Sequence, residues 1–308
     1  MSSYLELSAR QRIPHIFDAG SFEEFLPPSA RVVSPHLAQL DAPVSFDDGV
    51  IVGRGLLDGR VVFGAAQEGG FMGGAVGEVH GAKLVGMLRR AVDEGAHAVL
   101  LLLESGGVRL HEANAGLIAV SEVMRAILDV RAAGIPVVAL VGGANGCFGG
   151  MGITARCANT VVMSEEGRLA MSGPEVIETA HGVEEFDARD RALVWRTTGG
   201  KHRYLLGDCQ ALVADDTDAF RQAAIAAIAA AHEGEVALSL GELLAEQAML
   251  EGRLRDFGGQ IEPMEVWRAL GVPDPKAIPM LEADAFVALA DHYRAGADAG
   301  ASTSTGGR

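Results

Sequence analysis

A repeated pattern constrains the fold of this chain more than any other feature. An unbroken apolar run at residues 98–103 leads into Ser-Gly-Gly and then a segment with helical periodicity, and the apolar run at 137–141 leads into "GGANGCFGGMG" and another such segment. Apolar runs without alternation are typical of strands that are covered on both faces. Strands separated by helices need crossover connections, so the pattern predicts a layered α/β fold.

The neighbouring segments favour the same class. Residues 49–67 alternate β-branched residues with turn formers and contain "LDGR", an Asp-Gly hairpin signal. Residues 79–92 have apolar side chains at helical spacing, with Gly95 as a C-cap. A second helix with one apolar stripe is predicted from Leu117 to Arg131, closed by Gly134.

The chain divides into four predicted parts. Residues 1–45 form a lead-in that packs on a core at 46–232, which is followed by a helical extension at 233–294 and a small, polar tail at 295–308 that we expect to be disordered. Within the core, residues 190–207 predict a basic amphipathic helix followed by a Thr-Thr-Gly-Gly turn. The alanine-rich helix at 219–231 offers a close-packing surface, which we assign to a partner subunit.

Composition excludes several classes of protein. The chain has 25 Lys and Arg against 41 Asp and Glu, a net charge of −16, and no dense basic run, which excludes a nucleic-acid groove. Its start lacks an export signal, and its apolar runs are far shorter than the roughly 18 to 20 residues of a membrane helix. Three widely spaced cysteines without Cys-x-x-Cys fit a reducing cytoplasm and indicate no metal site. We therefore expect a cytoplasmic protein.

The glycine pairs after the two buried strands have several interpretations. One is structural: glycine allows the tight turn that is needed before the helix. A nucleotide site fits poorly, because the second cluster lacks the Lys-Ser/Thr end of a P-loop and the first lacks the later glycine and acid of a dinucleotide fingerprint. The remaining functional interpretation is an oxyanion hole, in which backbone N–H groups stabilise a thioester oxygen that becomes negative.

Seven motifs in order resemble the N-terminal domains of acyl-CoA carboxyltransferases. They include "RQRIPHIFDAGSFEEF", "ESGGVRLHEANAGL", "GGANGCFGGMG" and "TTGGKHRYLLGD", and they cover roughly residues 10–216. The resemblance implies a crotonase-like (ClpP/crotonase) α/β fold of repeated β-β-α units, here with a helical C-terminal extension. Within that superfamily the chain is most similar to the beta subunits of biotin-independent malonate decarboxylases.

The resemblance also implies the site residues. The matching oxyanion glycines are Gly106, Gly107, Gly149 and Gly150, which we predict to be catalytic. The predicted substrate-binding residues are Val108, Arg109, Gly146, Cys147, Lys201, His202 and Arg203. The basic members of this set, together with Lys83, could meet the phosphates of a CoA-like arm, although most such charges lie on solvated surface.

The implied activity is decarboxylation of a malonyl thioester through an enolate. The substrate would be carried on the CoA-like prosthetic group of an acyl carrier subunit, with no cofactor bound covalently to this chain and no biotin, metal or nucleotide required. Implied partners are a gamma subunit of the same fold, the acyl carrier subunit and an acyl-carrier transferase subunit. Two alternatives stay open at this stage: the beta half of a biotin-dependent carboxyltransferase, and a non-catalytic scaffold subunit.

The enolate must be protonated, and the sequence offers three candidate acids. These are His111, Cys147 and Tyr204, although Cys147 fits better as a small apolar filler and water could serve instead. Glu104, at the end of a buried strand, is interpreted as an acceptor that orients nearby N–H groups. Carboxyltransferases usually have Asp before Ser-Gly-Gly and Ala-Arg after it, so Glu104 and Val108 separate this chain from the ordinary members.

Overall fold

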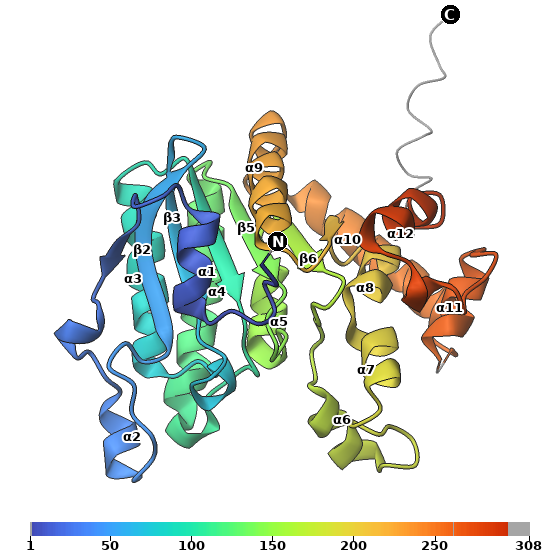
Figure 1. Ribbon diagram of the computed structural model, residues 1–308, viewed down its shortest axis with the longest axis horizontal. Helices are drawn as coiled ribbons and strands as arrows, with labels where there is room; N and C mark the ends of the chain where they lie inside the picture. The colour runs from blue at the N-terminus through green and yellow to red at the C-terminus, as the bar shows by residue number, and fades with distance from the viewer. Residues whose placement is uncertain (1, 261, 295–308) are drawn as a thin grey trace, which may run out of the picture.

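One seven-stranded sheet organises the chain (Figure 1), and its spatial order follows the sequence from β1 to β7. The computed structural model describes residues 2–260 and 262–294. The first three strands pair antiparallel, and β3 to β7 continue the sheet with parallel pairs. The strands are β1 Glu23–Phe25, β2 Val50–Leu57, β3 Arg60–Gln67, β4 Ala98–Leu103, β5 Val137–Val141, β6 Thr160–Ser164 and β7 Ala211–Val213.

Helices cover both faces of this sheet. One layer contains α3 and α4, and the opposite layer contains α1 and α9, as the two buried clusters on either side of the sheet show. The helices are α1 Ala9–Ile16, α2 Pro35–Gln39, α3 Glu78–Asp93, α4 Asn114–Ala132, α5 Gly149–Ala155, α6 Pro174–His181, α7 Arg191–Thr198, α8 Gly200–Leu206, α9 Thr217–Glu233, α10 Leu240–Phe257, α11 Pro263–Ala269 and α12 Ala283–Ala290. The α/β crotonase-like class predicted from the sequence is confirmed by this architecture and by the structural relatives given below.

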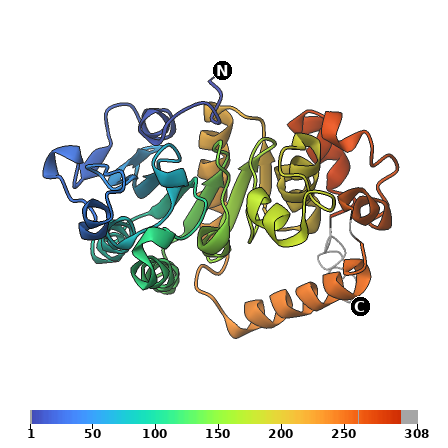
Figure 2. The ribbon, with the colours of Figure 1, turned by 90° about the horizontal axis from the view of Figure 1, so that it is seen from below.

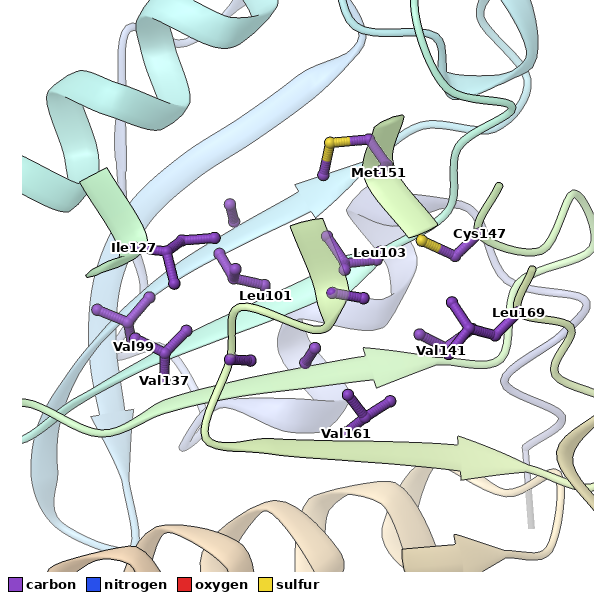
Figure 3. Close-up of a cluster of buried hydrophobic side chains, with 14 of the residues drawn as sticks. Val99, Leu101, Leu103, Ile127, Val137, Val141, Cys147, Met151, Val161 and Leu169 are labelled. Carbon is purple, nitrogen blue, oxygen red and sulfur yellow. The ribbon is translucent and has the colours of Figure 1, made fainter. Parts of the chain in front are cut away.

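Strand β4 shows why the apolar run has no alternation. Its residues are all buried: the side chains of Val99, Leu101 and Leu103 lie in the cluster under α3 and α4 (Figure 3). The residues between them lie in the cluster under α1 and α9. Burying a leucine side chain of this kind contributes roughly 1.5–3 kcal/mol. The sequence therefore has to supply apolar residues at every position of the strand.

The predicted hairpin and helix ends are confirmed. Leu57 and Arg60 pair across the turn, where Asp58 and Gly59 both adopt positive φ, and Gly95 follows the end of α3 with φ +62°. The predicted apolar stripe of α4 is wrong at Leu117, which is 54% exposed.

A small residue, Ala119, lies on the buried face of α4 where α3 and α4 pack closely. A Cβ added at Gly81 of α3 would lie 3.2 Å from the α-carbon of Ala119 of α4 and would overlap its side chain. Small residues at such a contact let two helices approach, while a leucine would hold them apart. Leu117 lies off the buried face, which runs through Gly116, Ala119 and Val123.

One further prediction needs correction. Residues 190–207 form two helices rather than one helix and a turn, because Gly199 has extended backbone between α7 and α8 and caps both. The alanine-rich helix α9 buries Phe220, Ala224 and Ala227 against its own sheet, so part of its close-packing surface serves the core, and its assignment to a partner subunit stays a prediction. The physical reason is that alanine lets α9 lie close to β5 and β6.

The C-terminal part leaves the sheet after α9. Helix α10 extends as an arm beside the body of the molecule (Figure 2), and α11 and α12 pack near α7 and α8. The predicted disorder of 295–308 falls outside the described residues, and the boundaries of the four predicted parts stay predictions. Over 2–260 and 262–294, every helix is too short or too polar to cross a membrane.

Candidate functional site

The two glycine-rich segments come together at one edge of the sheet. They follow the neighbouring parallel strands β4 and β5, whose carboxyl ends meet at the same edge. The N–H of Ser105 donates to the carbonyl oxygen of Gly146 at 2.8 Å, and the N–H of Phe148 donates to the carbonyl oxygen of Ser105 at 2.7 Å. We call residues 104–109 the first glycine loop and residues 142–150 the second. These bonds fix the two loops against each other.

Glycine is required where the loops touch. A Cβ added at Gly107 would lie 3.1 Å from the α-carbon of Gly149, and the reverse distance is the same. Both residues have positive φ, +114° at Gly107 and +58° at Gly149. Neither position accepts a side chain without strain and a shift of the facing loop.

Three of the four predicted oxyanion glycines donate their N–H groups inside the protein. The N–H of Gly106 donates to the carbonyl of Gly73 at 2.8 Å, and that of Gly149 to the carbonyl of Met171 at 2.9 Å. The N–H of Gly107 donates to the Ser105 hydroxyl at 3.1 Å. These glycines therefore shape the loops in this conformation instead of offering open donors.

Other N–H groups of the two loops lack an acceptor among the described residues, among them those of Val108, Gly143, Ala144 and Gly150. Gly150 lies in the first turn of α5, where N–H groups have no partner within the helix. Its nitrogen would lie 3.4 Å from a Cβ added at Gly107, the residue before Val108. Val108 and Gly150 thus give one donor from each loop at the point where the loops meet, while Gly143 and Ala144 lie near the start of the second loop.

Arg109 lies inside the protein. Its guanidinium is fully buried and pairs with Asp48 at 3.0 Å and Glu112 at 2.8 Å. Asp48 also accepts the backbone N–H of His80 at 2.8 Å. The structure therefore places Arg109 where it anchors the first glycine loop to α3 and β2, with no exposed charge for a phosphate group.

Lys83 is also turned inward. Its ammonium group donates to the carbonyls of Asp47 at 2.7 Å and Val50 at 2.5 Å, and burial lowers its pKa. The cation therefore satisfies carbonyls beside β2 and has little surface to offer a phosphate.

The segment "GGKHR" does not form a shared basic patch. Lys201 donates to the carbonyl of Pro279 at 3.2 Å, and Arg203 pairs with Asp208 at 3.1 Å. His202 is buried and accepts from the indole N–H of Trp267 at 3.0 Å, and burial lowers its pKa to about 3. Each of the three side chains is thus engaged with a different part of the C-terminal half.

Cys147 is a core residue. It is completely buried among Leu103, Met151 and Leu169 (Figure 3). Burial raises the pKa of its thiol to about 12. The thiol is therefore a poor proton donor, and the interpretation as an apolar filler is confirmed.

The other two candidate acids have different surroundings. Tyr204 is buried, its hydroxyl donates to Asp291 at 2.6 Å, and burial together with that bond raises its pKa to about 12. His111 is exposed and lies two residues beyond Arg109, next to the first glycine loop. Of the three side chains, His111 alone has access to solvent at the loops.

Glu104 orients the second glycine loop, as predicted. The backbone N–H of Asn145 donates to its carboxylate at 3.1 Å, and Arg12 of α1 forms a buried ion pair with it. Sequence reasoning missed both partners. Arg12 is 92 positions from Glu104 along the chain, and no local pattern signals that the two meet.

No cluster of three or more His, Cys, Asp or Glu side chains suited to a metal ion occurs within 2–260 and 262–294. The candidate site consists of backbone donors framed by glycine, and the exposed His111 follows Val108 by three residues in the sequence.

Comparison with known proteins identifies the family. Residues 6–229 match the carboxyl transferase domain family. The chain belongs to this family. It is 40% identical over 311 residues to the malonyl-S-ACP:biotin-protein carboxyltransferase of Malonomonas rubra, covering 95% of this chain and 97% of that protein.

Two further relatives place the chain within the family. The structure resembles a subunit of a Pseudomonas malonate decarboxylase hetero-tetramer in complex with malonate, with a TM-score of 0.79 and 43% identity over 87% of this chain and 97% of that one. A propionyl-CoA carboxylase beta chain of Saccharopolyspora erythraea is 33% identical over 204 residues, but the match covers only 36% of that protein. The carboxyl transferase fold and a role in carboxyl transfer or decarboxylation are thus shared with its relatives.

Proposed function

We propose that this chain is the beta subunit of a malonate decarboxylase and that it acts on a malonyl thioester carried by an acyl carrier subunit. The observation that carries the proposal is the meeting of the two glycine loops, with the N–H groups of Val108 and Gly150 lacking an acceptor among the described residues. The likeness to the malonate decarboxylase of Pseudomonas and to the malonyl-carrier enzyme of Malonomonas rubra supports the choice of substrate.

The reaction breaks the bond between the α-carbon and the carboxylate carbon. CO2 leaves, and the electron pair moves through the α-carbon to the thioester oxygen, which becomes an enolate. The N–H groups of Val108 and Gly150 would donate to this oxygen, where charge develops in the transition state. Interactions that strengthen in the transition state accelerate the chemical step.

The surrounding residues have supporting roles. Gly107 and Gly149 let the backbones approach each other and the thioester. A proton must then reach the α-carbon to complete the acetyl thioester. His111 or water supplies this proton in the proposal, because Cys147 and Tyr204 are buried.

The assembly we propose contains other subunits. A gamma subunit of the same fold, an acyl carrier subunit and an acyl-carrier transferase subunit would complete it, and the hetero-tetramer of the Pseudomonas relative supports this view. Helix α10 also supports the presence of a partner chain. None of its described residues is buried, and its exposed leucines are Leu240, Leu243, Leu244, Leu250 and Leu254. Such a row of exposed leucines is typical of a protein interface.

Two versions of this function differ in the fate of the carboxyl group, which is either transferred to biotin or released as CO2. The Malonomonas rubra relative is named for transfer to a biotin protein, which favours a biotin-dependent variant as the second candidate. We propose the biotin-independent reaction, in which CO2 leaves directly. A scaffold role is less favoured, because two glycine loops in tight contact suit close approach to a substrate.

An assay of the assembled complex tests the proposal. Malonyl-pantetheine serves as the probe, and mass spectrometry follows the acetyl thioester while trapped radiolabel measures CO2. We expect both products at equal rates, with or without avidin, and no carboxylated product when free biotin is added. Inhibition by avidin, or carboxybiotin formation, would establish the biotin-dependent alternative. Failure to consume the thioester would overturn both.

A further inference from the structure

Glu104 joins the two glycine loops through its side chain. Its backbone opens the first loop, directly after β4, and its carboxylate accepts the N–H of Asn145 in the second loop at 3.1 Å. The next residue of the second loop, Gly146, accepts the N–H of Ser105. One backbone bond and one side-chain bond therefore link the same short stretches.

The carboxylate is held from its other side by α1. The Arg12 guanidinium pairs with the second carboxylate oxygen, and the residues Arg12 and Glu104 are only 1% and 5% exposed. Arg12 itself donates to the carbonyl of Tyr4 at 3.0 Å and lies over its ring, 4.5 Å from the centroid. Because the pair is buried, neither group can turn to water without a large cost.

The space around the carboxylate is shaped for a glutamate. A Cβ added at Gly143 would overlap the carboxylate of Glu104, and so would one added at Gly69. The backbone N–H of Glu104 donates to the side-chain oxygen of Gln67 on β3, at 3.2 Å. Aspartate is one methylene shorter, so it could not reach both Arg12 and Asn145 from the same backbone position.

We infer that Glu104 is a positioning residue, which sets the separation of the two N–H donors at Val108 and Gly150, and that Arg12 holds it in place. The inference rests on the proposed function, because the reaction gives that separation its importance. Glu104 does not contact the substrate. It acts by fixing Asn145, five residues before Gly150, against the start of the first loop.

The test compares three variants in the assembled complex. Glu104→Asp keeps the charge but shortens the reach, Arg12→Lys keeps the charge but loses the planar fork, and Arg221→Met is the control. Arg221 anchors the other end of α1, through the carbonyl of Ile16 at 2.5 Å and Asp18 at 2.6 Å. The control therefore loosens α1 without touching either glycine loop.

We expect Glu104→Asp to lower kcat by about tenfold or more with KM within about twofold, since a displaced oxyanion donor affects the transition state most. Arg12→Lys should give a smaller loss in the same direction, and Arg221→Met should leave kcat unchanged. Amide hydrogen exchange gives a readout without substrate: Glu104→Asp should speed exchange in both glycine loops together, while Arg221→Met should not.

Two outcomes would overturn the inference. One is a folded Glu104→Asp complex with native kcat and native exchange in the loops; the other is an equal loss of kcat in Arg221→Met, which would point to general loosening of α1. If Glu104→Asp does not fold, Arg12→Lys carries the same comparison. A native complex that does not decarboxylate malonyl-pantetheine would instead refute the proposed function, and the exchange result would still decide whether Glu104 couples the loops.

Discussion

The contact between Gly107 and Gly149 gives a prediction whose magnitude can be worked from the structure. Gly149→Ala would place a methyl group 3.1 Å from the α-carbon of Gly107 and 3.3 Å from the carbonyl oxygen of Gly106. Ordinary carbon contacts lie near 3.5–4.0 Å. The two loops would have to move apart by a few tenths of an ångström, and these loops carry the proposed oxyanion donors.

A matched control separates this shift from backbone strain. Gly149 has φ +58° and Gly95, at the end of α3, has φ +62°, but nothing lies within 4 Å of a Cβ added at Gly95. Alanine in the left-handed region costs about 1–2 kcal/mol at either site. Both variants should therefore carry a similar cost of backbone strain, and only Gly149→Ala should add the cost of moving the loops apart.

We expect Gly149→Ala to reduce kcat by about 10²-fold, which corresponds to roughly 2.7 kcal/mol and equals the loss of one oxyanion donor. Gly95→Ala should keep kcat within about twofold. The assay is malonyl-pantetheine decarboxylation by the assembled complex, with urea unfolding to compare the two stabilities. Equal kcat in both variants, with both folded under the assay conditions, would refute the reasoning that the loops hold the reacting oxygen.

Three further predictions test the placement of other side chains. His80 and His202 are buried, and burial lowers both pKa values to about 3, below the ordinary 6.5. The free energy of unfolding should therefore be retained above pH 6.5 and fall as the pH drops below it, by up to about 2 kcal/mol for each histidine at pH 5. Urea unfolding at pH 7.5 and at pH 5.0 measures this fall. Arg109→Met should lower the free energy of unfolding by about 3–5 kcal/mol, because it leaves buried carboxylates unpaired; a stable variant with a raised KM would instead indicate a phosphate-binding role. Leu244→Glu and Leu254→Glu, at sites 62% and 74% exposed, should leave the melting temperature of the isolated chain unchanged but abolish co-purification with a gamma-type subunit; unaltered co-purification would remove α10 from the interface.

Local sequence patterns were enough to predict much of the core correctly. The unbroken apolar run of β4, the Asp-Gly turn between β2 and β3 and the glycine after α3 each reflect a constraint that acts within a few residues. Packing between helices is a different kind of constraint. Leu117 was wrongly assigned to the core because the buried face of α4 runs through Gly116, Ala119 and Val123, and the sequence of a single helix does not reveal which face its neighbour covers.

The candidate site likewise has features that local sequence determines and features that depend on contacts between distant segments. The sequence by itself determined that two glycine clusters follow two buried strands, because strand burial and tight turns are local, and several motifs in order pointed to the carboxyl transferase family. The tertiary structure decided which N–H groups lack an acceptor, since Gly106 and Gly149 donate to the carbonyls of Gly73 and Met171. It also turned Arg109 inward. Hydrogen bonds and ion pairs between distant segments depend on how the chain folds back, and only the three-dimensional arrangement specifies them.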